Sequence, residues 1–276
     1  MTVDMRLLVF GPGYTASRLM AAVQARGGEV ATVTRATFAD QARTRVEIAA
    51  ATHILSSIPP GEADPVLAAY GADLAASDKW LGYLSSTGVY GDTGGGWVDE
   101  SAPLRGRRGG RVDADLGWGA LPNAHVFRLP GIYGPERSAL ERMAAGATRV
   151  YFPGQVFSRV HVDDLVAGVV AAFEGPPGAY NLADDLPAPQ AEVLAYAAEL
   201  LGIDPGPAVT PDEVELSAAS RAFYAENRRV ANGKAKRLLG WRPRYADYRL
   251  GLRALKASTS PTSTSTPPPT ASSDQR

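Results

Sequence analysis

The stretch that decides the fold of this chain is LLVFGPGYTA, residues 7–16. It begins with the unbroken apolar run Leu7–Phe10, the main part of an expected strand over Met5–Phe10. Such a run is typical of a strand buried on both faces of a sheet. Behind the glycines, Ala16–Arg26 has apolar side chains on one face and ends at two further glycines, which predicts a helix. A glycine-rich turn between a buried strand and a helix is a setting in which proteins bind phosphate groups.

The turn has the residues that such binding requires. Gly11 permits a tight turn, Gly13 lets the backbone approach a pyrophosphate, and Ala16, in place of a third glycine, still allows close packing of the helix on the sheet. The N–H groups and the positive dipole end of the helix would face the phosphate. We therefore expect a dinucleotide to be bound by Gly11, Gly13, Tyr14, Thr15 and Ala16. The alternative is a glycine turn that binds no ligand.

The first 130 residues alternate strand-like runs with helical patterns. Strands are expected at Met5–Phe10, Glu29–Thr34, Thr52–Ile58, Trp80–Ser85 and Ala124–Leu129, and helices over Ala16–Arg26 and from Asp64-Pro65 through Ala76. Strands that alternate with helices of this length form right-handed crossover units around a parallel sheet. The pattern predicts an α/β fold of the Rossmann type, with a doubly wound parallel sheet.

The later part of the chain is mostly helical in pattern. Helices are expected over Val162–Phe173, Gln190–Leu201, Ala218–Asn227 and Lys234–Leu239, with a short strand at Ala179–Leu182. We expect residues 1–132 and 157–182 to form the dinucleotide-binding domain and residues 133–156 and 183–256 a small, mostly helical substrate lobe. Residues 257–276 are mainly Ser, Thr and Pro, too polar to fold, and are expected to be a disordered tail.

Composition narrows the classes of function. The 276 residues include 28 Lys and Arg against 29 Asp and Glu, so nothing indicates a nucleic-acid partner. The absence of cysteine excludes disulfides and thiolate zinc sites, and the three histidines show no metal-ligand spacing, so no metal is expected. No apolar stretch approaches the roughly 20 residues of a membrane span. We expect a soluble cytoplasmic protein that acts on a small molecule.

The end of the second strand indicates which dinucleotide is bound. An acidic residue at this place would accept a hydrogen bond from the 2′-hydroxyl of NAD, but this chain has Thr34-Arg35. A guanidinium group suits a 2′-phosphate, so NADP is the expected cofactor, with NAD as the alternative. An arginine exposed on a loop, with no ligand, is the other interpretation of Arg35.

Five later segments add a resemblance to a known family. They are LSSTGVYGD (84–92), FRLPGIYGP (127–135), RVHVDD (159–164), YNL (180–182) and LLGWRP (238–243). In this order they resemble landmarks of the extended short-chain dehydrogenases/reductases, of the epimerase/dehydratase type. The resemblance implies an NAD(P)-binding Rossmann fold and is consistent with a homodimer. It also implies that Pro130, Gly131 and Ile132 lie beside the nicotinamide.

The catalytic motif of that family is absent. The family uses a Ser or Thr, a Tyr and a Lys, the last two spaced as Tyr-x-x-x-Lys. The serine position falls on Ser86, but Arg111 and Asp115 stand where the tyrosine and lysine belong, and no tyrosine of the chain has a lysine four residues later. An arginine that stays protonated and an aspartate cannot reproduce a tyrosine whose pKa is lowered by an ammonium group. The pattern resembles the atypical, YeeZ-like branch of the superfamily.

Four residues remain candidates for chemistry. Ser86, with Thr87 as an alternate, follows a strand at the edge where ligands bind in such sheets, although it could equally bond only to the backbone. Tyr90 could act as an acid but is usually structural in the resembling families. Asp115 could act as an acid or base; otherwise it belongs to a solvated helix face or pairs with Arg111.

Other polar residues are expected to contact the cofactor or to be structural. Ser56, near the end of the expected strand Thr52–Ile58, and Pro59, directly after it, would line the ribose, and Ser85 is grouped with the cofactor site. His161 precedes Asp163, an expected helix N-cap, and is interpreted as structural.

Two functions are consistent with these residues. The first is an NADP-dependent oxidoreductase, epimerase or dehydratase acting on a small polar substrate such as a sugar nucleotide. The second is a non-catalytic NADP-binding sensor or scaffold, which the missing Tyr and Lys favour.

Overall fold

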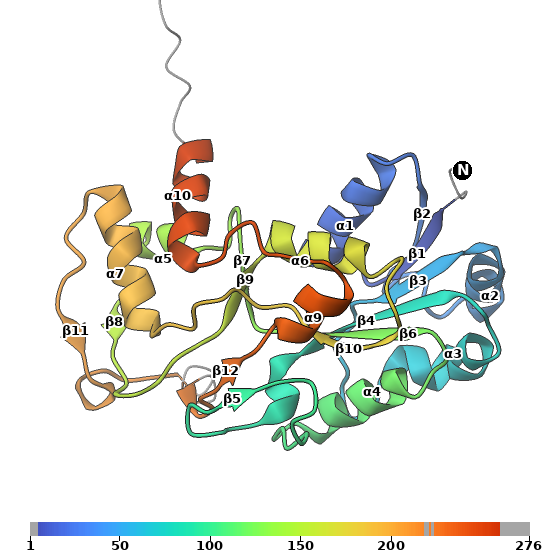
Figure 1. The fold of residues 1–276 in the computed structure, drawn as a ribbon, viewed down its shortest axis with the longest axis horizontal. Coiled ribbons are helices and arrows are strands. Elements are labelled where there is room, and N and C mark those ends of the chain that lie inside the picture. Colours follow the sequence, from blue (N-terminus) through green and yellow to red (C-terminus); the bar gives the residue numbers. More distant parts are fainter. Residues whose placement is uncertain (1–4, 218–220, 222–223, 260–276) are drawn as a thin grey trace, which may run out of the picture.

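A six-stranded parallel sheet forms the centre of the chain in the computed structural model, which describes residues 5–217, 221 and 224–259 (Figure 1). The strand order is β10-β6-β4-β3-β1-β2. The strands are β1 (Arg6–Phe10), β2 (Glu29–Val33), β3 (His53–Ser56), β4 (Trp80–Ser86), β6 (Ala124–Leu129) and β10 (Gly178–Asn181). The predicted doubly wound Rossmann fold is confirmed.

Helices cover both faces of the sheet. They are α1 (Tyr14–Gln24), α2 (Gln41–Ala50), α3 (Pro65–Ala75), α4 (Gly109–Gly119) and α6 (Val162–Ala171). Leu7 and Val9 pack with α1 and α6 on one face, whereas Leu8 and Phe10 pack with α2, α3 and α4 on the other. This alternation explains why β1 is apolar at every position from Leu7 to Phe10. The pattern did not predict α2, because only Thr44 and Ile48 of that helix are buried.

A second group of elements packs around its own apolar core beside the sheet (Figure 1). It comprises β7 (Gly131–Tyr133), α5 (Ala139–Ala144), β8 (Arg149–Val150), β9 (Arg159–His161), α7 (Gln190–Leu201), β11 (Ala208–Val209) and α10 (Tyr248–Thr259). Strand β7 pairs with β9 and β8 pairs with β11, both parallel. Helix α10 runs three residues past the boundary expected for the tail, and residues 260–276 lie outside the described part of the chain.

Short elements connect this group to the sheet. They are the 3₁₀ helices η1 (Thr87–Tyr90) and η2 (Pro211–Glu213), the paired strands β5 (Trp97–Val98) and β12 (Arg229–Val230), and α9 (Gly233–Leu238). Half of the helix expected over Ala218–Asn227 falls on residues outside the described part; of the described residues, Arg221 and Tyr224 are helical, whereas Glu226 and Asn227 are not. His161, rather than Asp163, is the N-cap of α6, where its Nδ1 accepts a hydrogen bond from the Asp163 N–H at 3.2 Å.

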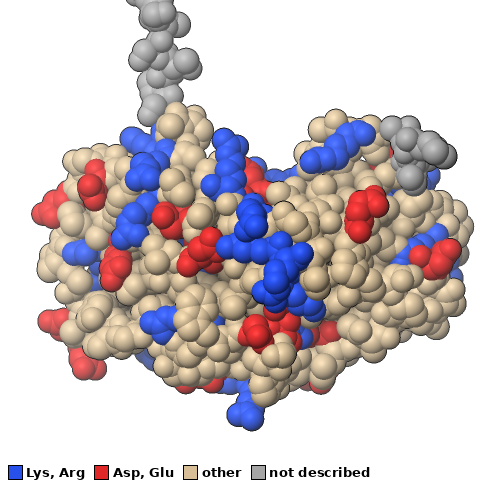
Figure 2. All heavy atoms as spheres, in the orientation of Figure 1, with Lys and Arg blue, Asp and Glu red and all other residues tan. Residues whose placement is uncertain are grey.

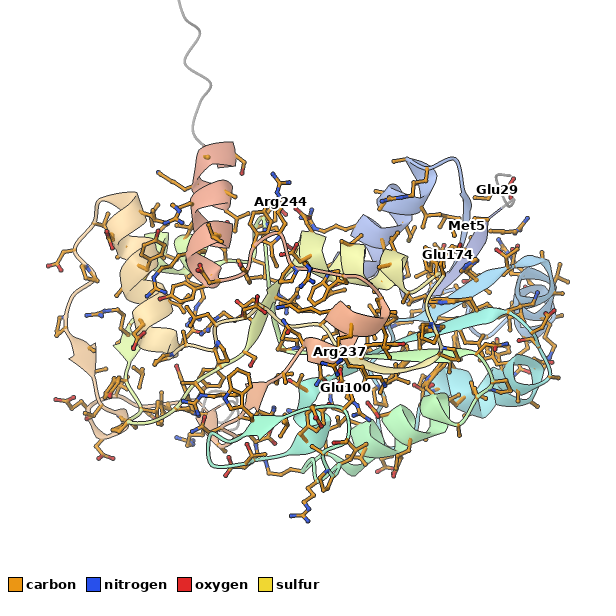
Figure 3. All side chains as sticks on the ribbon, in the orientation of Figure 1. Met5, Glu29, Glu100, Glu174, Arg237 and Arg244 are labelled. Carbon is orange, nitrogen blue, oxygen red and sulfur yellow. The ribbon has the colours of Figure 1, made fainter. Side chains whose placement is uncertain are left out.

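Acidic and basic side chains are interspersed on the face drawn in Figure 2, and Arg237 and Arg244, labelled in Figure 3, are among its basic residues. Among the described residues, no helix has both the length and the apolar character needed to cross a membrane.

The turn after β1 depends on Gly11. Its φ is +75°, and an added Cβ would lie 2.7 Å from Ile58 Cγ1. Gly13 differs, because its φ is −89° and an added Cβ would meet nothing within 4 Å. The first glycine is therefore required by the fold itself, and the second leaves open space in front of α1.

We expect Gly11→Ala to lower the free energy of unfolding by about 1–3 kcal/mol, because alanine would need a left-handed conformation and would collide with Ile58. Gly13→Ala is the matched control and should change stability by no more than about 0.5 kcal/mol. Urea denaturation of both variants measures the difference. Similar losses in both would contradict the distinction between the two glycines.

Asp184 is a buried carboxyl between the sheet and the second core. Its side chain is 1% exposed, and burial raises the pKa from 3.8 to about 8, against the opposing attraction of Arg159. The folded protein therefore holds a proton that the unfolded chain has lost between these two pH values. Stability should fall as the pH rises through that interval, by up to about 1.4 kcal/mol per pH unit.

Asp184→Asn removes this titration. We expect the melting temperature of the variant, relative to the wild-type protein, to rise from about pH 4 to about pH 8 and then to level off. Thermal unfolding at unit steps between pH 4 and pH 9 tests this. A difference that stays constant with pH would show that Asp184 does not titrate in this range.

Candidate functional site

A cavity of about 510 Å³ lies where β4 and β6 end. Ser86, Thr87 and Gly88 line it at the end of β4, and Leu129, Pro130 and Gly131 line it at the end of β6. The two strands are neighbours in the sheet, and Ser86 is in register with Leu129. The carboxyl edge of a parallel sheet is the usual place for a ligand in this architecture. The structure therefore brings together four of the residues predicted for the site, Ser86, Thr87, Pro130 and Gly131.

The opposite wall comes from segments far away in the sequence. Val156, Phe157 and Ser158 precede β9, and Val230 belongs to β12. The Ser158 hydroxyl accepts a hydrogen bond from the Val230 N–H at 2.9 Å, which joins the two segments. Apart from Ser158, this wall is apolar.

Four arginines also line the cavity: Arg107, Arg108, Arg111 and Arg228. Glu226 is the acidic residue among them, and it accepts from Arg107 Nε at 3.0 Å and from Arg228 Nη1 at 2.7 Å. Burial raises the pKa of Glu226, but the hydrogen bonds from these two arginines outweigh burial, so the pKa lies below its ordinary value. Glu226 is therefore a carboxylate held between two guanidinium groups.

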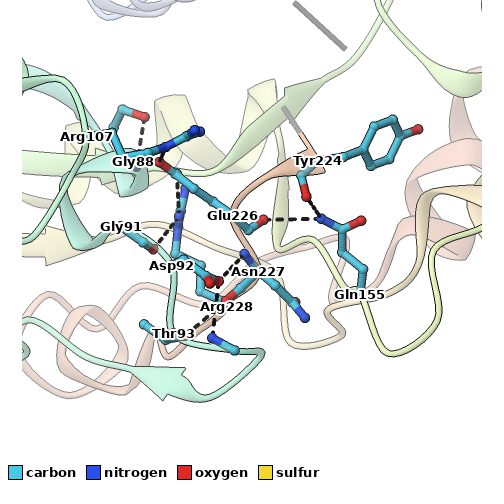
Figure 4. Close-up of polar contacts among 12 residues, drawn as sticks. Gly88, Gly91, Asp92, Thr93, Arg107, Gln155, Tyr224, Glu226, Asn227 and Arg228 are labelled. Atoms are coloured by element: carbon cyan, nitrogen blue, oxygen red, sulfur yellow. Dashed lines mark hydrogen bonds and ion pairs between the residues drawn. The ribbon is translucent and has the colours of Figure 1, made fainter. Parts of the chain in front are cut away.

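Hydrogen bonds fix Glu226 and Arg228 over the end of β4 (Figure 4). Arg228 Nη1 donates to the Gly91 carbonyl at 2.6 Å. The Asn227 N–H donates to Asp92 Oδ1 at 2.8 Å, and Gln155 Nε2 donates to the Glu226 carbonyl at 3.4 Å. The segment around residue 227 is thus bonded both to the loop after η1 and to the loop before β9.

Ser86 and Thr87 occupy different positions in the cavity. Ser86 is partly exposed, and its Oγ accepts a hydrogen bond from the Gly88 N–H at 3.2 Å, as the N-cap of η1. Thr87 is 5% exposed. Both interpretations of Ser86 are therefore compatible with its position, because a hydroxyl that accepts from the backbone can still donate to a ligand.

Tyr90 and Asp115 are not among the residues that line the cavity. The Tyr90 hydroxyl donates to Asn181 Oδ1 at 2.7 Å and accepts from Arg128 Nη1 at 3.1 Å, and burial raises its pKa. Asp115, 2% exposed, accepts from Arg128 Nη2 at 2.7 Å and from the Ser85 hydroxyl at 2.6 Å. These groups form one buried network behind the residues that line the cavity.

The network differs from the two structural alternatives that the sequence offered for Asp115, a solvated helix face and a pair with Arg111. The pairing partner is Arg128 of β6 rather than Arg111, and the residue is not on a solvated face. Glu100, labelled in Figure 3, extends the network, because its carboxylate accepts from the Asn181 N–H at 2.7 Å and its carbonyl from Arg128 Nη1 at 3.2 Å.

The glycine turn fits a bound phosphate. Gly13 is the N-cap of α1 with no side-chain hydrogen bond to the helix, and the first turn has no acidic residue. Thr15 and Ala16 are buried, so their side chains point into the protein and only their backbone could contact a ligand. The Tyr14 hydroxyl donates to the Pro135 carbonyl at 2.9 Å, which links the turn to the segment after β7. Backbone N–H groups at an uncapped helix start are therefore open to a phosphate.

The residues predicted for the rest of the dinucleotide lie along the same edge. Thr34 and Arg35 follow β2, and the exposed Arg35 guanidinium has no hydrogen-bond or ion-pair partner within the described part of the chain. Pro59 is exposed after β3, whereas Ser56 is fully buried and its hydroxyl is unpaired among the described residues. Ile132 lies on β7, next to Gly131.

The sequence did not predict most of the charged residues that line the cavity. Arg107, Arg108, Glu226 and Arg228 were not singled out, and Arg111 was noted only as standing in place of a tyrosine. The run LRGRRGGR, residues 104–111, carried a signal, because arginines gather just before a helix that should face the sheet edge. For residues 226–228 there was none, since their proximity depends on the tertiary fold.

We expect Asp115→Asn to lower the free energy of unfolding by about 3–5 kcal/mol, because Arg128 would remain buried with its charge uncompensated. Asp113→Asn, on the exposed face of the same helix, is the control and should have an effect of no more than about 0.5 kcal/mol. Chemical denaturation measures both. An Asp115→Asn variant that retains its stability would contradict the structural role of the pair.

The sequence and the structure were compared with those of known proteins. No family model matches the sequence. The structure of a functionally unknown conserved protein from Silicibacter pomeroyi is 43% identical in sequence, with a TM-score of 0.84 over 92% of this chain and 99% of that one. A 3-diazoavenalumate denitrifying reductase from Streptomyces sp is 32% identical over 186 residues, which make up 56% of this chain and 58% of the reductase.

Two sugar-nucleotide enzymes share the architecture at low identity. UDP-glucose 4-epimerase from Thermotoga maritima, solved with UDP-glucose, has a TM-score of 0.74 at 16% identity, over 92% of this chain and 99% of the epimerase. dTDP-glucose 4,6-dehydratase from Streptomyces venezuelae, solved with NAD and TYD, has a TM-score of 0.73 at 19% identity, over 92% and 96%. The chain belongs to the family of the Silicibacter pomeroyi protein, and its fold is that of the extended short-chain dehydrogenases/reductases of the epimerase/dehydratase type.

Proposed function

We propose that this protein binds a nicotinamide dinucleotide, preferably NADP, and acts as an oxidoreductase, epimerase or dehydratase on a small polar substrate in the cavity beside Ser86. The observation that carries the proposal is the joint placement of two features on one sheet edge. The uncapped start of α1 follows β1, and the cavity lies at the ends of β4 and β6, two and three strands away in the sheet.

The chain offers contacts for each part of the dinucleotide. The backbone at Gly11 and Gly13 and the first turn of α1 would hold the pyrophosphate. Thr34 and Arg35 would contact the adenosine ribose and its 2′-phosphate, and Pro59 the edge of the ribose site. Pro130, Gly131 and Ile132 would lie beside the nicotinamide, which supplies a hydride donor or acceptor when bound.

The substrate side differs from the usual chemistry of this fold. Among the described residues that line the cavity there is no tyrosine, lysine, histidine or cysteine, and Glu226 is held ionised between two arginines. Ser86 and Thr87 would donate hydrogen bonds to a substrate oxygen. Guanidinium groups would stabilise negative charge that develops there, a role that requires no change in their own protonation.

The relatives support a nicotinamide enzyme without fixing the reaction. Reductase, epimerase and dehydratase activities all occur among them. The epimerase was solved with UDP-glucose and the dehydratase with NAD and TYD. A sugar nucleotide is therefore one candidate substrate for this chain, and a reducible small molecule is another. The reductase match spans little more than half of each chain.

A non-catalytic NADP-binding sensor or scaffold is the second candidate. It is favoured by the engagement of Tyr90 and Asp115 in the buried network around Arg128, which leaves neither free for proton transfer. If Ser86→Ala abolishes a measurable turnover without weakening dinucleotide binding, the sensor hypothesis is wrong.

We expect the purified protein to bind NADPH more tightly than NADH, and Arg35→Ser to weaken NADPH binding about tenfold to a hundredfold while NADH binding is unchanged, because a charged hydrogen bond to the 2′-phosphate is lost. Nicotinamide fluorescence titration measures both. Arg43→Ser, an exposed arginine of α2 near the same edge of the sheet, is the control. Tighter binding of NADH would contradict the role of Arg35, and binding of neither nucleotide would contradict the proposed function.

A further inference from the structure

We propose that the substrate of this protein is a small organic anion, and that Arg108 and Arg111 bind its carboxylate or phosphate group in the cavity beside Ser86. The proposal deepens the proposed function and rests on it for the identification of this cavity as the substrate site. Three features of the cavity support it: an excess of positive charge, two arginines with free donors, and an apolar wall.

The cavity carries an excess of positive charge. In the part of the chain that the structure describes, four arginines line it against the one carboxylate of Glu226. That carboxylate is bonded to Arg107 and Arg228 together, so one negative charge is shared by two guanidinium groups. Four fixed positive charges against one negative charge in a partly enclosed space attract an anion and raise its local concentration.

Arg108 and Arg111 are the arginines with donors to spare. Neither has a hydrogen-bond or ion-pair partner for its guanidinium group among residues 5–217, 221 and 224–259. Arg108 is the N-cap of α4 and Arg111 lies in the first turn of that helix, where no acidic residue is present. A guanidinium fork matches the two oxygens of a carboxylate or phosphate, and the positive end of the helix dipole adds to the attraction.

Close packing fixes the position of this helix start. An added Cβ at Gly110 would lie 2.2 Å from the Gly61 carbonyl oxygen, so α4 approaches the loop after β3 as closely as a glycine permits. The helix is also joined to β6 through Asp115 and Arg128 at 2.7 Å. The backbone that carries Arg108 and Arg111 is therefore held in place before a ligand binds, which reduces the entropic cost of binding.

The rest of the cavity suits an organic body rather than an inorganic ion. Leu129, Val156, Phe157 and Val230 contribute apolar lining, and the volume of about 510 Å³ lies in the range that small-molecule sites occupy. A ligand with one anionic end and a compact apolar or mixed body would place the anion on α4 and the body against this wall.

Three probes test the proposal: cinnamate and cinnamamide differ in charge but have nearly the same shape, and phenyl phosphate carries a phosphate group on the same aromatic ring. Cinnamate, phenyl phosphate and neutral cinnamamide are titrated into the NADPH-bound protein by isothermal calorimetry. We expect at least one of the two anions to bind about tenfold or more tightly than cinnamamide, and the better anion identifies the group as carboxylate or phosphate. Arg111→Gln and Arg108→Gln should each reduce that preference about tenfold, and the double variant should abolish it.

Arg105→Gln is the control, because Arg105 is an exposed arginine of the same segment that does not line the cavity. Arg111→Lys keeps the charge and loses the fork, so an intermediate affinity is expected even if the glutamine variant folds poorly. Equal binding of the anions and cinnamamide, an equal loss in Arg105→Gln, or competition of the anions with NADPH would overturn the proposal. Anion preference without NADPH binding would contradict only the proposed function.

Discussion

The ion pair between Arg128 and Asp115 connects the parts of this protein that its site depends on. Arg128 belongs to β6 and Asp115 to α4, and both are nearly inaccessible to solvent. Removing two charges from water is costly unless their remaining hydrogen-bonding capacity is satisfied. Here Ser85 of β4 donates to the aspartate, while Tyr90 of η1 and the Glu100 carbonyl accept from the arginine. The sheet, the helix and the loop after β4 can therefore hardly move independently.

This network changes what the usual catalytic positions do. In the resembling family the helix after the fourth strand carries a tyrosine and a lysine for proton transfer, whereas here the second of those positions is Asp115 and points into the buried pair. The first is Arg111, which lines the cavity. The same backbone framework thus presents a fixed positive charge in place of an acid. Binding and electrostatic stabilisation are what such a group can contribute.

The other side of the cavity depends on contacts between distant segments. Glu226 and Arg228 precede β12, more than 130 residues after Gly91, yet Arg228 donates to the Gly91 carbonyl at 2.6 Å. Asn227 is bonded to Asp92 and Gln155 to Glu226, so the loop before β9 is included (Figure 4). Because Glu226 links Arg107 to Arg228, the charge of the cavity is organised by the same contacts that close it.

The sequence by itself determined the framework. The apolar run before Gly11, the glycine turn and the alternation of strands and helices specify a parallel sheet with a phosphate-binding edge, because such patterns depend on residues close in the chain. It also predicted Ser86 and Arg35 as site residues, because each directly follows a predicted strand. Helix α2 was not predicted, because only two of its residues are buried and its apolar pattern is therefore weak.

Only the tertiary structure decided which charges meet. Nothing local distinguishes Asp115 from Asp113, yet one is buried against Arg128 and the other is exposed. Likewise, the arginines of residues 107–111 and 228 become one site only when β12 lies beside β5. Electrostatic interactions act through space over a few ångströms, so the partners of a charge depend on the folded chain and not on its neighbours in the sequence.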